Sequence, residues 1–425
     1  MDVELKYGTG VISVHLPESA ESRILEPNEM PSLPSIPDAL QEALSDLAEN
    51  DRNILPDVSC ASVAIAIPDE TRPLPVAELL PALLDWLFAQ LPDIDPDKVI
   101  IVIGGGLHPP LDDAAAQRLV SPDIARGCRL LSHDANKSPM DDFGRTSWGT
   151  PVLVNREYSR ADYKIVVGQI DPHQFVGFTG GSKGVVIGCG GAATIEHNHG
   201  LMFQDNAVVG VLHGNPVRED INEAGKMIGV DLAVNCVMSP NKEVVEVLVG
   251  KPLDTLRDGA KICADLYGVY IDRKFDILIA SCGGHPKDIC LYQAQKGLNM
   301  ASMAVKKGGK ILLLAASTKG VGDDVYFDYV SQFTSPEEVL ADFKKQGFRM
   351  GAHKAYLFGS TLTQYDVAIC SEMDPGILQK CHLRAADPSR VIAEWVETFE
   401  GRPKIGIIPN ANTTYFYGLR SSSTT

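Results

Sequence analysis

The chain has 425 residues, a formal net charge of −17 at pH 7, 44% hydrophobic residues and 22% charged residues. This length predicts two domains, and the composition is that of an ordinary globular protein. The negative charge, without any Lys/Arg-rich block, argues against nucleic acid as a partner, and no apolar run approaches the roughly 20 residues of a membrane helix.

The N-terminal stretch MDVELKYGTGVISVHLPES lacks the basic and then apolar layout of a signal peptide, so we expect a cytoplasmic protein. The nine cysteines are scattered and include no C-x-x-C pair. This pattern predicts reduced, mostly buried thiols and argues against a disulfide framework or a zinc ribbon.

Short β-branched apolar runs that end in Gly, Asp, Asn or Ser predict buried parallel strands. They lie at 61–69, 98–106, 163–171, 275–284, 309–317, 365–374 and 404–412. Amphipathic helices are predicted at 76–91, 335–347 and 387–401, and residues 18–58 should wrap the surface as loop and helix. The alternation predicts two α/β domains with mainly parallel sheets, and we expect the active site in the cleft between them.

The domain boundary is predicted near Arg273, because residues 247–276 look like one helix followed by a short exposed strand, after which the alternation restarts. We therefore expect an N-terminal cofactor-binding domain at 1–272 and a second domain at 273–404, with residues 405–425 packing back on the first. The final SSSTT is predicted to be disordered.

Polar side chains follow three of the predicted strands, where ligands collect in open parallel sheets. Asp69 and Arg72 follow the strand at 61–69, His108 follows the next, and His173 follows the strand at 163–171. Each has a simpler interpretation, a turn ion pair for Asp69 and Arg72 and a solvated loop position for each histidine. Their recurrence at successive strand ends favours one site, and two histidines suit opposed proton transfers near neutral pH.

A glycine-rich stretch, HQFVGFTGGSKGVVIGCGGAATIEHNHG, runs from His173 to Gly200. It fails the P-loop pattern, because Ser182 and Gly184 stand where the second Gly and the Ser/Thr should be, so a nucleoside triphosphatase is disfavoured. Free backbone N–H groups still suit a phosphate-bearing ligand. Lys183 is compatible with a nucleophilic or covalently linked amine and equally with a plain phosphate contact. His197 and His199 are two apart, so at most one should bind a metal if the segment is helical.

A second group follows the strand at 275–284. Tyr292 and Lys296 share one face of a predicted helix, with Gln293 beside them. The simpler alternative is an exposed, solvated lysine.

Five spaced motifs together resemble the nickel-pincer lactate racemases and related 2-hydroxyacid racemases and epimerases. They cover nearly the whole chain and are Asp69-x-Thr-Arg72-Pro, Gly-Gly-x-His108, His173-x-Phe-x-Gly-Phe-x-Gly-Gly-x-Lys183, Asn198-His199, and Tyr292-Gln293-Ala-x-Lys296-Gly.

The resemblance implies a nickel-pincer nucleotide, nickel pyridinium-3,5-bisthiocarboxylic acid mononucleotide, as cofactor. It implies that Lys183 is the tether and that His199 completes the coordination of nickel, a role that neutral imidazole suits. It also assigns cofactor contacts to Asp69, Gly180, Gly181 and Ser182. Cofactor-synthesis proteins are then expected partners, and the enzyme should act as monomer or homodimer on a small 2-hydroxy acid.

The implied reaction removes the hydroxyl proton of the substrate while its C2 hydride passes to the pyridinium, and hydride return to the other face inverts the centre. His108 and His173 resemble the acid/base pair, one for each enantiomer. Arg72 and Lys296 resemble the groups that hold the carboxylate and ketone oxygens. Tyr292 and Gln293 are further expected substrate contacts.

The chain departs from the lactate racemase pattern at Glu70, at Ser182-Lys183-Gly184, and at His353, which stands where those enzymes place a tryptophan over the substrate methyl group. A histidine facing the substrate tail favours a larger or more polar 2-hydroxy acid than lactate.

Two other classes of function stay open at this point. One is a metal-dependent hydrolase with His108, His173 and His199 as ligands, although it lacks a local acid such as that of H-E-x-x-H. The other is a non-catalytic protein that binds a phosphorylated cofactor.

Overall fold

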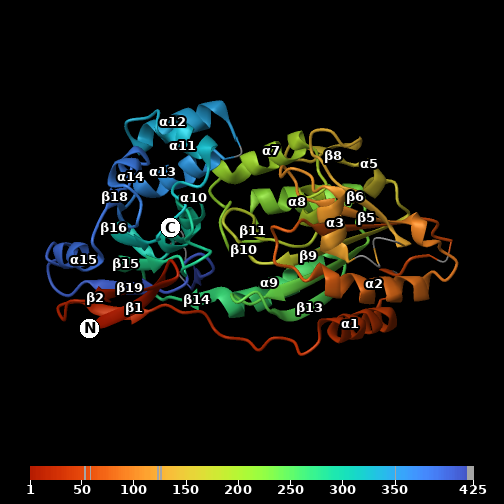
Figure 1. Cartoon of the computed structure of the whole chain (residues 1–425), viewed down its shortest axis with the longest axis horizontal. Coiled ribbons are helices and arrows are strands. Elements are labelled where there is room, and N and C mark those ends of the chain that lie inside the picture. Colours follow the sequence, from red (N-terminus) through yellow and green to blue (C-terminus); the bar gives the residue numbers. More distant parts are fainter. Residues whose placement is uncertain (52–53, 58, 122–123, 125–126, 350, 419–425) are drawn as a thin grey trace, which may run out of the picture. The chain divides into compact units, whose positions relative to one another are not determined.

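The computed structural model describes residues 1–51, 54–57, 59–121, 124, 127–349 and 351–418. The chain forms two compact units, which we describe one at a time (Figure 1). The inserted unit is Glu29–Leu266, and the split unit is Met1–Asn28 together with Tyr267–Thr425. The SSSTT tail lies outside the described residues. Among the described helices, none is both long and apolar enough to cross a membrane.

The inserted unit is built on a six-stranded sheet of order β13-β12-β9-β4-β5-β6, in which only the edge strand β13 is antiparallel. Its strands are β4 (Val63–Pro68), β5 (Val99–Gly104), β6 (Arg129–Ser132), β9 (Tyr163–Ile170), β12 (Leu232–Met238) and β13 (Val244–Gly250). The strands predicted at 61–69, 98–106 and 163–171 are confirmed as β4, β5 and β9. The runs of β4 and β5 are apolar because both faces of the central sheet are buried there, whereas β9 also carries the half-buried Lys164 and Gln169.

Helices and two short ladders surround this sheet. The helices are α1 (Ile36–Asn50), α2 (Val76–Gln90), α3 (Asp113–Val120), α5 (Arg156–Ser159), α6 (Lys183–Val186), α7 (Ala192–Gly200), α8 (Pro216–Ile228) and α9 (Pro252–Tyr267), with 3-10 turns at Pro96–Lys98 and Leu201–Phe203. The ladders pair β7 (Met140–Arg145) with β8 (Pro151–Asn155) and β10 (Pro172–His173) with β11 (Gly177–Phe178). Buried leucines of α1 and α2, including Leu40, Leu44 and Leu79, pack against the strands in one core. The predicted helix at 76–91 is therefore confirmed as α2.

The strand order creates a switch point between β4 and β9. From β4 the chain moves to β5 and β6 on one side, and it then returns to place β9 on the other side of β4. The loops that follow β4 and β9 therefore leave neighbouring strands in opposite directions. Such a place, at the carboxyl ends of the strands, is where open α/β sheets bind ligands.

The split unit has its own six-stranded sheet, fully parallel, of order β18-β17-β16-β15-β19-β3. Its strands are β3 (Glu21–Ile24), β15 (Phe275–Ser281), β16 (Val305–Leu314), β17 (Asp366–Cys370), β18 (Arg384–Ala385) and β19 (Lys404–Ile408), and its short ladders pair β1 (Asp2–Tyr7) with β2 (Gly10–His15) and β14 (Gly268–Tyr270) with β20 (Tyr415–Tyr417). The helices are α10 (Leu291–Ser302), α11 (Asp324–Val330), α12 (Pro336–Gln346), α13 (His353–Leu362), α14 (Pro375–Lys380) and α15 (Pro388–Val396). The four strands and two helices predicted in this region are confirmed.

The structure divides the chain into units differently from the single boundary predicted at residues 272/273. The first 28 residues belong to the split unit, because Leu5 and Val14 of the β1–β2 hairpin pack into its core with Ile277 and Trp395. The strand β3 also pairs with β19, which places the red N-terminal segment beside the blue C-terminal one in Figure 1. Residues 405–418, predicted to pack back on the N-terminal domain, belong instead to the split unit through β19 and β20.

Candidate active site

The predicted polar residues of the inserted unit follow three adjacent strands. Asp69 and Arg72 follow β4, His108 follows β5, and His173 begins the loop after β9. The three strands lie side by side in the sheet as β9-β4-β5, at the switch point. These residues therefore lie at the carboxyl ends of adjacent strands, on one edge of one sheet, as predicted.

Asp69 and His108 form a hydrogen-bonded pair in which the carboxylate is buried and the imidazole is exposed. Asp69 Oδ2 lies 2.7 Å from His108 Nδ1, and Asp69 Oδ1 accepts hydrogen bonds from the Thr71 hydroxyl at 2.5 Å and the Thr71 backbone N–H at 3.3 Å. Burial would raise the pKa of Asp69, but the bonds from His108 and Thr71 and the charge of Arg72 hold it below its usual value. A carboxylate only accepts, so His108 carries its proton on Nδ1 and presents the lone pair of Nε2.

His173 has the opposite tautomer. The backbone N–H of Val176 donates to His173 Nδ1 at 3.3 Å, so a neutral ring carries its proton on Nε2. Burial, with the neighbouring Lys183, His199, Arg72 and Arg218, holds the pKa of His173 well below its usual value. The two histidines thus offer a base at one position and a hydrogen-bond donor at the other.

The glycine loop has a backbone that side chains would not tolerate. Gly177, Gly180 and Gly181 have φ values of +79°, +84° and +57°. A Cβ atom on Gly180 would lie 2.5 Å from Ile170 Cγ1, and one on Gly181 would lie 2.9 Å from the Pro252 carbonyl. These positions therefore require glycine for both conformation and space.

Two buried polar residues that the sequence analysis did not identify hold this loop. Arg218 on α8 is fully buried and donates to the carbonyls of Val176, Phe178 and Gly180. Asn235 on β12 accepts from the Gly181 N–H at 3.2 Å. Burial lowers the pKa of Arg218 to about 9. Because its bonds go to carbonyls, Arg218 fixes the loop and keeps its positive charge next to Lys183.

Lys183 is a partly buried amine among cations. Burial, with Arg72 and Arg218 nearby, lowers the pKa of Lys183 to about 7. Near neutral pH a large share of the amine is therefore unprotonated, the form that attacks an electrophile.

Arg72 is exposed, and within the described part of the chain no Asp or Glu carboxylate forms an ion pair with it. Its guanidinium remains available to a carboxylate ligand.

His199 lies on α7 with its ring oriented by Asn198. His199 Nδ1 is 3.1 Å from Asn198 Oδ1, and the Asn198 amide donates to Asp220 Oδ2 at 2.7 Å and to the Val217 carbonyl at 3.1 Å. These two bonds fix the amide so that its oxygen faces His199, which puts the ring proton on Nδ1 and the lone pair on Nε2. Phe175 lies between the two rings, with centroids 4.6 Å from His173 and 5.2 Å from His199.

His197 points elsewhere, as the two-residue spacing predicted. Its side chain is exposed, and its Nδ1 lies 2.8 Å from Thr150 Oγ1, which also contacts Asp220 Oδ2 at 2.8 Å. His197 therefore belongs to the hydrogen-bond network that holds Asp220 and Asn198.

In the described part of the chain, no group of three or more His, Cys, Asp or Glu side chains is arranged to hold a metal ion. His108, His173 and His199 all lie in that part, so they do not form the three-histidine site that the hydrolase hypothesis requires.

The second predicted group lies on α10 of the split unit. Tyr292 and Lys296 are one turn apart on the same face, Lys296 is exposed, and Gln293 is half-buried beside them. Burial, with Asp323 and Cys290 nearby, raises the pKa of Tyr292 to about 12, so the phenol stays protonated.

His353 is the first residue of α13, and its ring lies next to the ring of Tyr292. Its ring centroid lies 6.4 Å from that of Tyr292 and 5.4 Å from that of Phe348. The next residue, Lys354, was not identified from the sequence. Its Nζ lies 5.2 Å from the centre of the Tyr292 ring and donates to Gln295 Oε1 at 2.8 Å.

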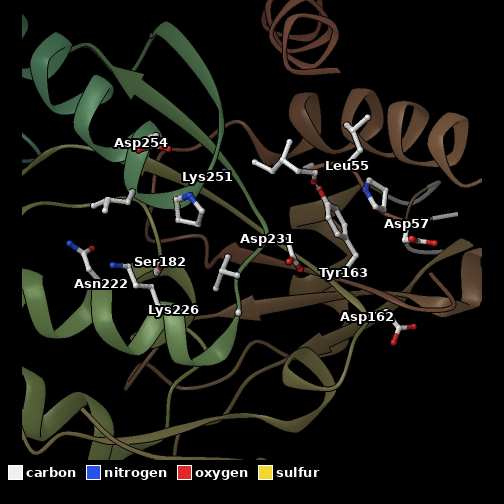
Figure 2. Close-up of a pocket in the computed structure, with 17 residues that line it drawn as sticks. Leu55, Asp57, Asp162, Tyr163, Ser182, Asn222, Lys226, Asp231, Lys251 and Asp254 are labelled. Atoms are coloured by element: carbon white, nitrogen blue, oxygen red, sulfur yellow. Dashed lines mark hydrogen bonds between the residues drawn. The ribbon is translucent and has the colours of Figure 1, made fainter. Parts of the chain in front are cut away.

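A separate pocket of about 590 Å³ opens in the inserted unit near α8 and α9 (Figure 2). Among the predicted site residues only Ser182 lines it, so the pocket does not hold the histidines or Lys183. Its acidic residues are Asp57, Asp162, Asp231 and Asp254, against Lys226 and Lys251. This excess of carboxylates makes the pocket unsuitable for a phosphate group.

Two family models match this chain, one along each half of the sequence. The family model of the lactate racemase N-terminal domain matches residues 7–210, and that of the lactate racemase C-terminal domain matches residues 271–413. The lactate racemases of Thermoanaerobacterium thermosaccharolyticum and Lactiplantibacillus plantarum are both 27% identical to this chain, over 81% and 82% of it and 82% and 83% of their own lengths.

Solved structures share the fold. The lactate racemase apoprotein of T. thermosaccharolyticum superimposes with a TM-score of 0.87 at 23% identity, over 98% of this chain and 100% of that one. A Thermotoga maritima protein gives 0.60 at 18% identity, over 92% of this chain and 100% of that one. With both family models matched in order along two α/β units, the chain belongs to the lactate racemase family and is an isomerase.

Proposed function

We propose that this enzyme inverts the C2 centre of a 2-hydroxy acid by reversible hydride transfer to a nickel-pincer nucleotide, and that its substrate is larger or more polar than lactate. The observation that carries the proposal is the set of groups at one sheet edge. A lysine with a pKa of about 7 lies in the glycine loop near His173, and His108, which has the opposite tautomer, follows another strand of the same sheet edge.

The residues of the loop fit such a cofactor. Lys183 supplies a nucleophilic amine for the tether, and the glycines before it let the loop pack closely against Ile170 and Asn235, which holds Lys183 at the end of the loop. His199 presents the lone pair of Nε2 as a ligand for Ni(II). When bound, the cofactor would supply an electrophilic ring that accepts the C2 hydride.

His108 is the group that removes the hydroxyl proton. Its Nε2 carries the lone pair, and Asp69 stabilises the imidazolium that forms. Arg72 holds the substrate carboxylate, and His173 donates from Nε2 to a substrate oxygen. For the other enantiomer the histidines exchange roles, which requires the weak 3.3 Å bond from Val176 to break so that His173 can accept a proton at Nε2.

The choice of substrate rests on His353. Burial, with Lys354 nearby, lowers the pKa of His353 to about 3, so the ring is neutral, and its Nδ1 is buried with no hydrogen-bond partner among the described residues. A buried nitrogen without a partner costs about 1–3 kcal/mol, which a polar substrate tail would recover and a methyl group would not. We propose that Tyr292, Gln293 and Lys296 bind the same substrate.

One experiment tests the proposal. Protein made together with the cofactor-synthesis proteins should contain one nickel and an added mass on Lys183, and it should invert single-enantiomer 2-hydroxy acids in a polarimetric assay. Lys183→Ala should lose both the mass and the inversion, while the exposed Lys137→Ala keeps both. Full activity in nickel-free protein without the added mass would overturn the proposal.

A further inference from the structure

Asp220, on α8 of the inserted unit, is a fully buried carboxylate that only neutral groups bind. Its Oδ1 accepts from the Thr146 hydroxyl at 2.5 Å, and its Oδ2 accepts from the Thr150 hydroxyl at 2.8 Å and from the Asn198 amide at 2.7 Å. Within the described part of the chain, no Lys, Arg or His side chain forms an ion pair with Asp220. Burying a charge without a cation costs stability, so this carboxylate is not explained by packing alone.

The carboxylate fixes the orientation of the Asn198 side chain. A carboxylate only accepts hydrogen bonds, so the amide nitrogen of Asn198 must face Asp220, and its second N–H donates to the Val217 carbonyl at 3.1 Å. The amide oxygen is thereby turned to His199 Nδ1, 3.1 Å away. The ring then carries its proton on Nδ1 and its lone pair on Nε2.

A hairpin distant in sequence holds Asp220 from its other side. Thr146 and Thr150 lie in the turn between β7 and β8, and the Thr150 backbone N–H donates to the Thr146 hydroxyl oxygen at 3.1 Å. The same turn makes a second contact with α8, in which Glu223 accepts from the backbone N–H and the hydroxyl of Ser147. Of these two contacts, only the one through Asp220 leads to His199.

We propose that Asp220 is a positioning residue for the candidate metal ligand, because through Asn198 it selects the tautomer in which His199 Nε2 can bind nickel. The inference rests on the proposed function and adds to it a residue remote from the metal. A ring protonated on Nε2 has no lone pair there for a metal. Hydrogen bonds that orient a histidine ligand in this way typically contribute about 10- to 100-fold to metal affinity.

The first test observes the tautomer in apoprotein. Protein labelled with ¹⁵N-histidine is examined by two-bond ¹H–¹⁵N correlation at pH 8.5, about two units above the ordinary pKa of histidine. The His199 signals are those that disappear in His199→Gln. We expect the Nδ1-protonated form in the unmodified protein and the appearance of the Nε2-protonated form in Asp220→Leu. Asp220→Asn should restore the first form, because its amide oxygen can accept from Asn198.

The second test measures nickel and the mass on Lys183 separately in loaded protein. Asp220→Leu should keep the added mass, because the tether does not involve His199, but should hold nickel about 10- to 100-fold less tightly in competition with a chelator. The matched control is Glu223→Gln, which alters the other contact between α8 and the hairpin and should change neither the tautomer nor the nickel.

An Nε2-protonated His199 in the unmodified apoprotein or in Asp220→Asn would overturn the inference, even if Asp220→Leu does not fold. Nickel held equally tightly by Asp220→Leu and the unmodified protein would also overturn it. These results leave the racemase proposal standing. The expected tautomers followed by loaded, unmodified protein without nickel would instead overturn the proposed function, and with it the role of Asp220 toward the metal.

Discussion

Replacing Asp69 by Asn should disable His108 through its tautomer. Thr71 donates twice to Asp69 Oδ1, from its hydroxyl at 2.5 Å and its backbone N–H at 3.3 Å, so an oxygen must occupy that position. The amide nitrogen of Asn must then take the place of Oδ2, 2.7 Å from His108 Nδ1. Because that nitrogen donates, His108 must accept at Nδ1 and move its own proton to Nε2, where the lone pair was.

The expected loss combines two effects. A hydrogen bond to a charged group contributes about 1.5–3 kcal/mol, or roughly 10- to 150-fold in rate. The wrong tautomer adds to this, since the same exchange in a serine protease triad lowers kcat by about 10⁴. We therefore expect kcat/KM to fall by at least about 100-fold, in equal measure for both enantiomers because the equilibrium constant of a racemisation is one.

The assay is the change in optical rotation with each enantiomer of the best substrate. Asp85→Asn, an exposed change on α2, is the matched control and should behave as the unmodified enzyme. Adding Thr71→Val to Asp69→Asn removes the shorter of the two bonds that orient the amide and leaves only the 3.3 Å bond from the backbone N–H, so the amide can turn more often and part of the activity should return. A single Asp69→Asn variant within threefold of the unmodified enzyme would refute the argument.

Three further predictions follow from other contacts. Arg218→Met leaves three loop carbonyls without their buried donor and should lower the free energy of unfolding by about 3 kcal/mol in urea denaturation, whereas the exposed Arg118→Met should not. In apoprotein at pH 7.5, acetic anhydride should modify Lys183 at least 10-fold faster than Lys137, and the rate should fall as the pH drops through about 7; equal rates would contradict the lowered pKa. His353→Trp should raise kcat/KM for lactate relative to kcat/KM for a larger 2-hydroxy acid. If the unmodified enzyme prefers lactate to all larger 2-hydroxy acids, His353 does not contact the substrate tail.

Seven strands of the two sheets were predicted, because their apolar runs are nearly continuous; they are β4, β5, β9, β15, β16, β17 and β19. Val63 and Ile277, for example, belong to strands whose two faces are both buried, so these strands consist almost entirely of apolar residues. The strand β3 was not predictable, since its four residues are exposed and its partner β19 lies at the other end of the chain. The assignment of the first 28 residues failed for the same reason.

Some residues of the candidate site could likewise be predicted from the sequence, and others could not. Asp69, His108 and His173 were found because chain order alone puts them at strand ends. Arg218 was not, because in PVREDINEAGKMI it looks like one more charge on an amphipathic helix, and only the tertiary structure buries it beneath the glycine loop. Lys354 was hidden likewise, as its burial depends on the packing of α13 against α10.

The split arrangement of the chain also sets an order for its synthesis. All residues of the inserted unit have been made once Leu266 is in place, whereas β3 must wait for β19, since Glu21 pairs with Lys404. At about 5–20 residues per second, making residues 267–404 takes roughly 7–28 s. During that interval the core that Leu5 and Val14 enter is incomplete, since it also contains Ile405 and Ile407. The first 28 residues therefore reach their native packing only after nearly the whole chain has been made.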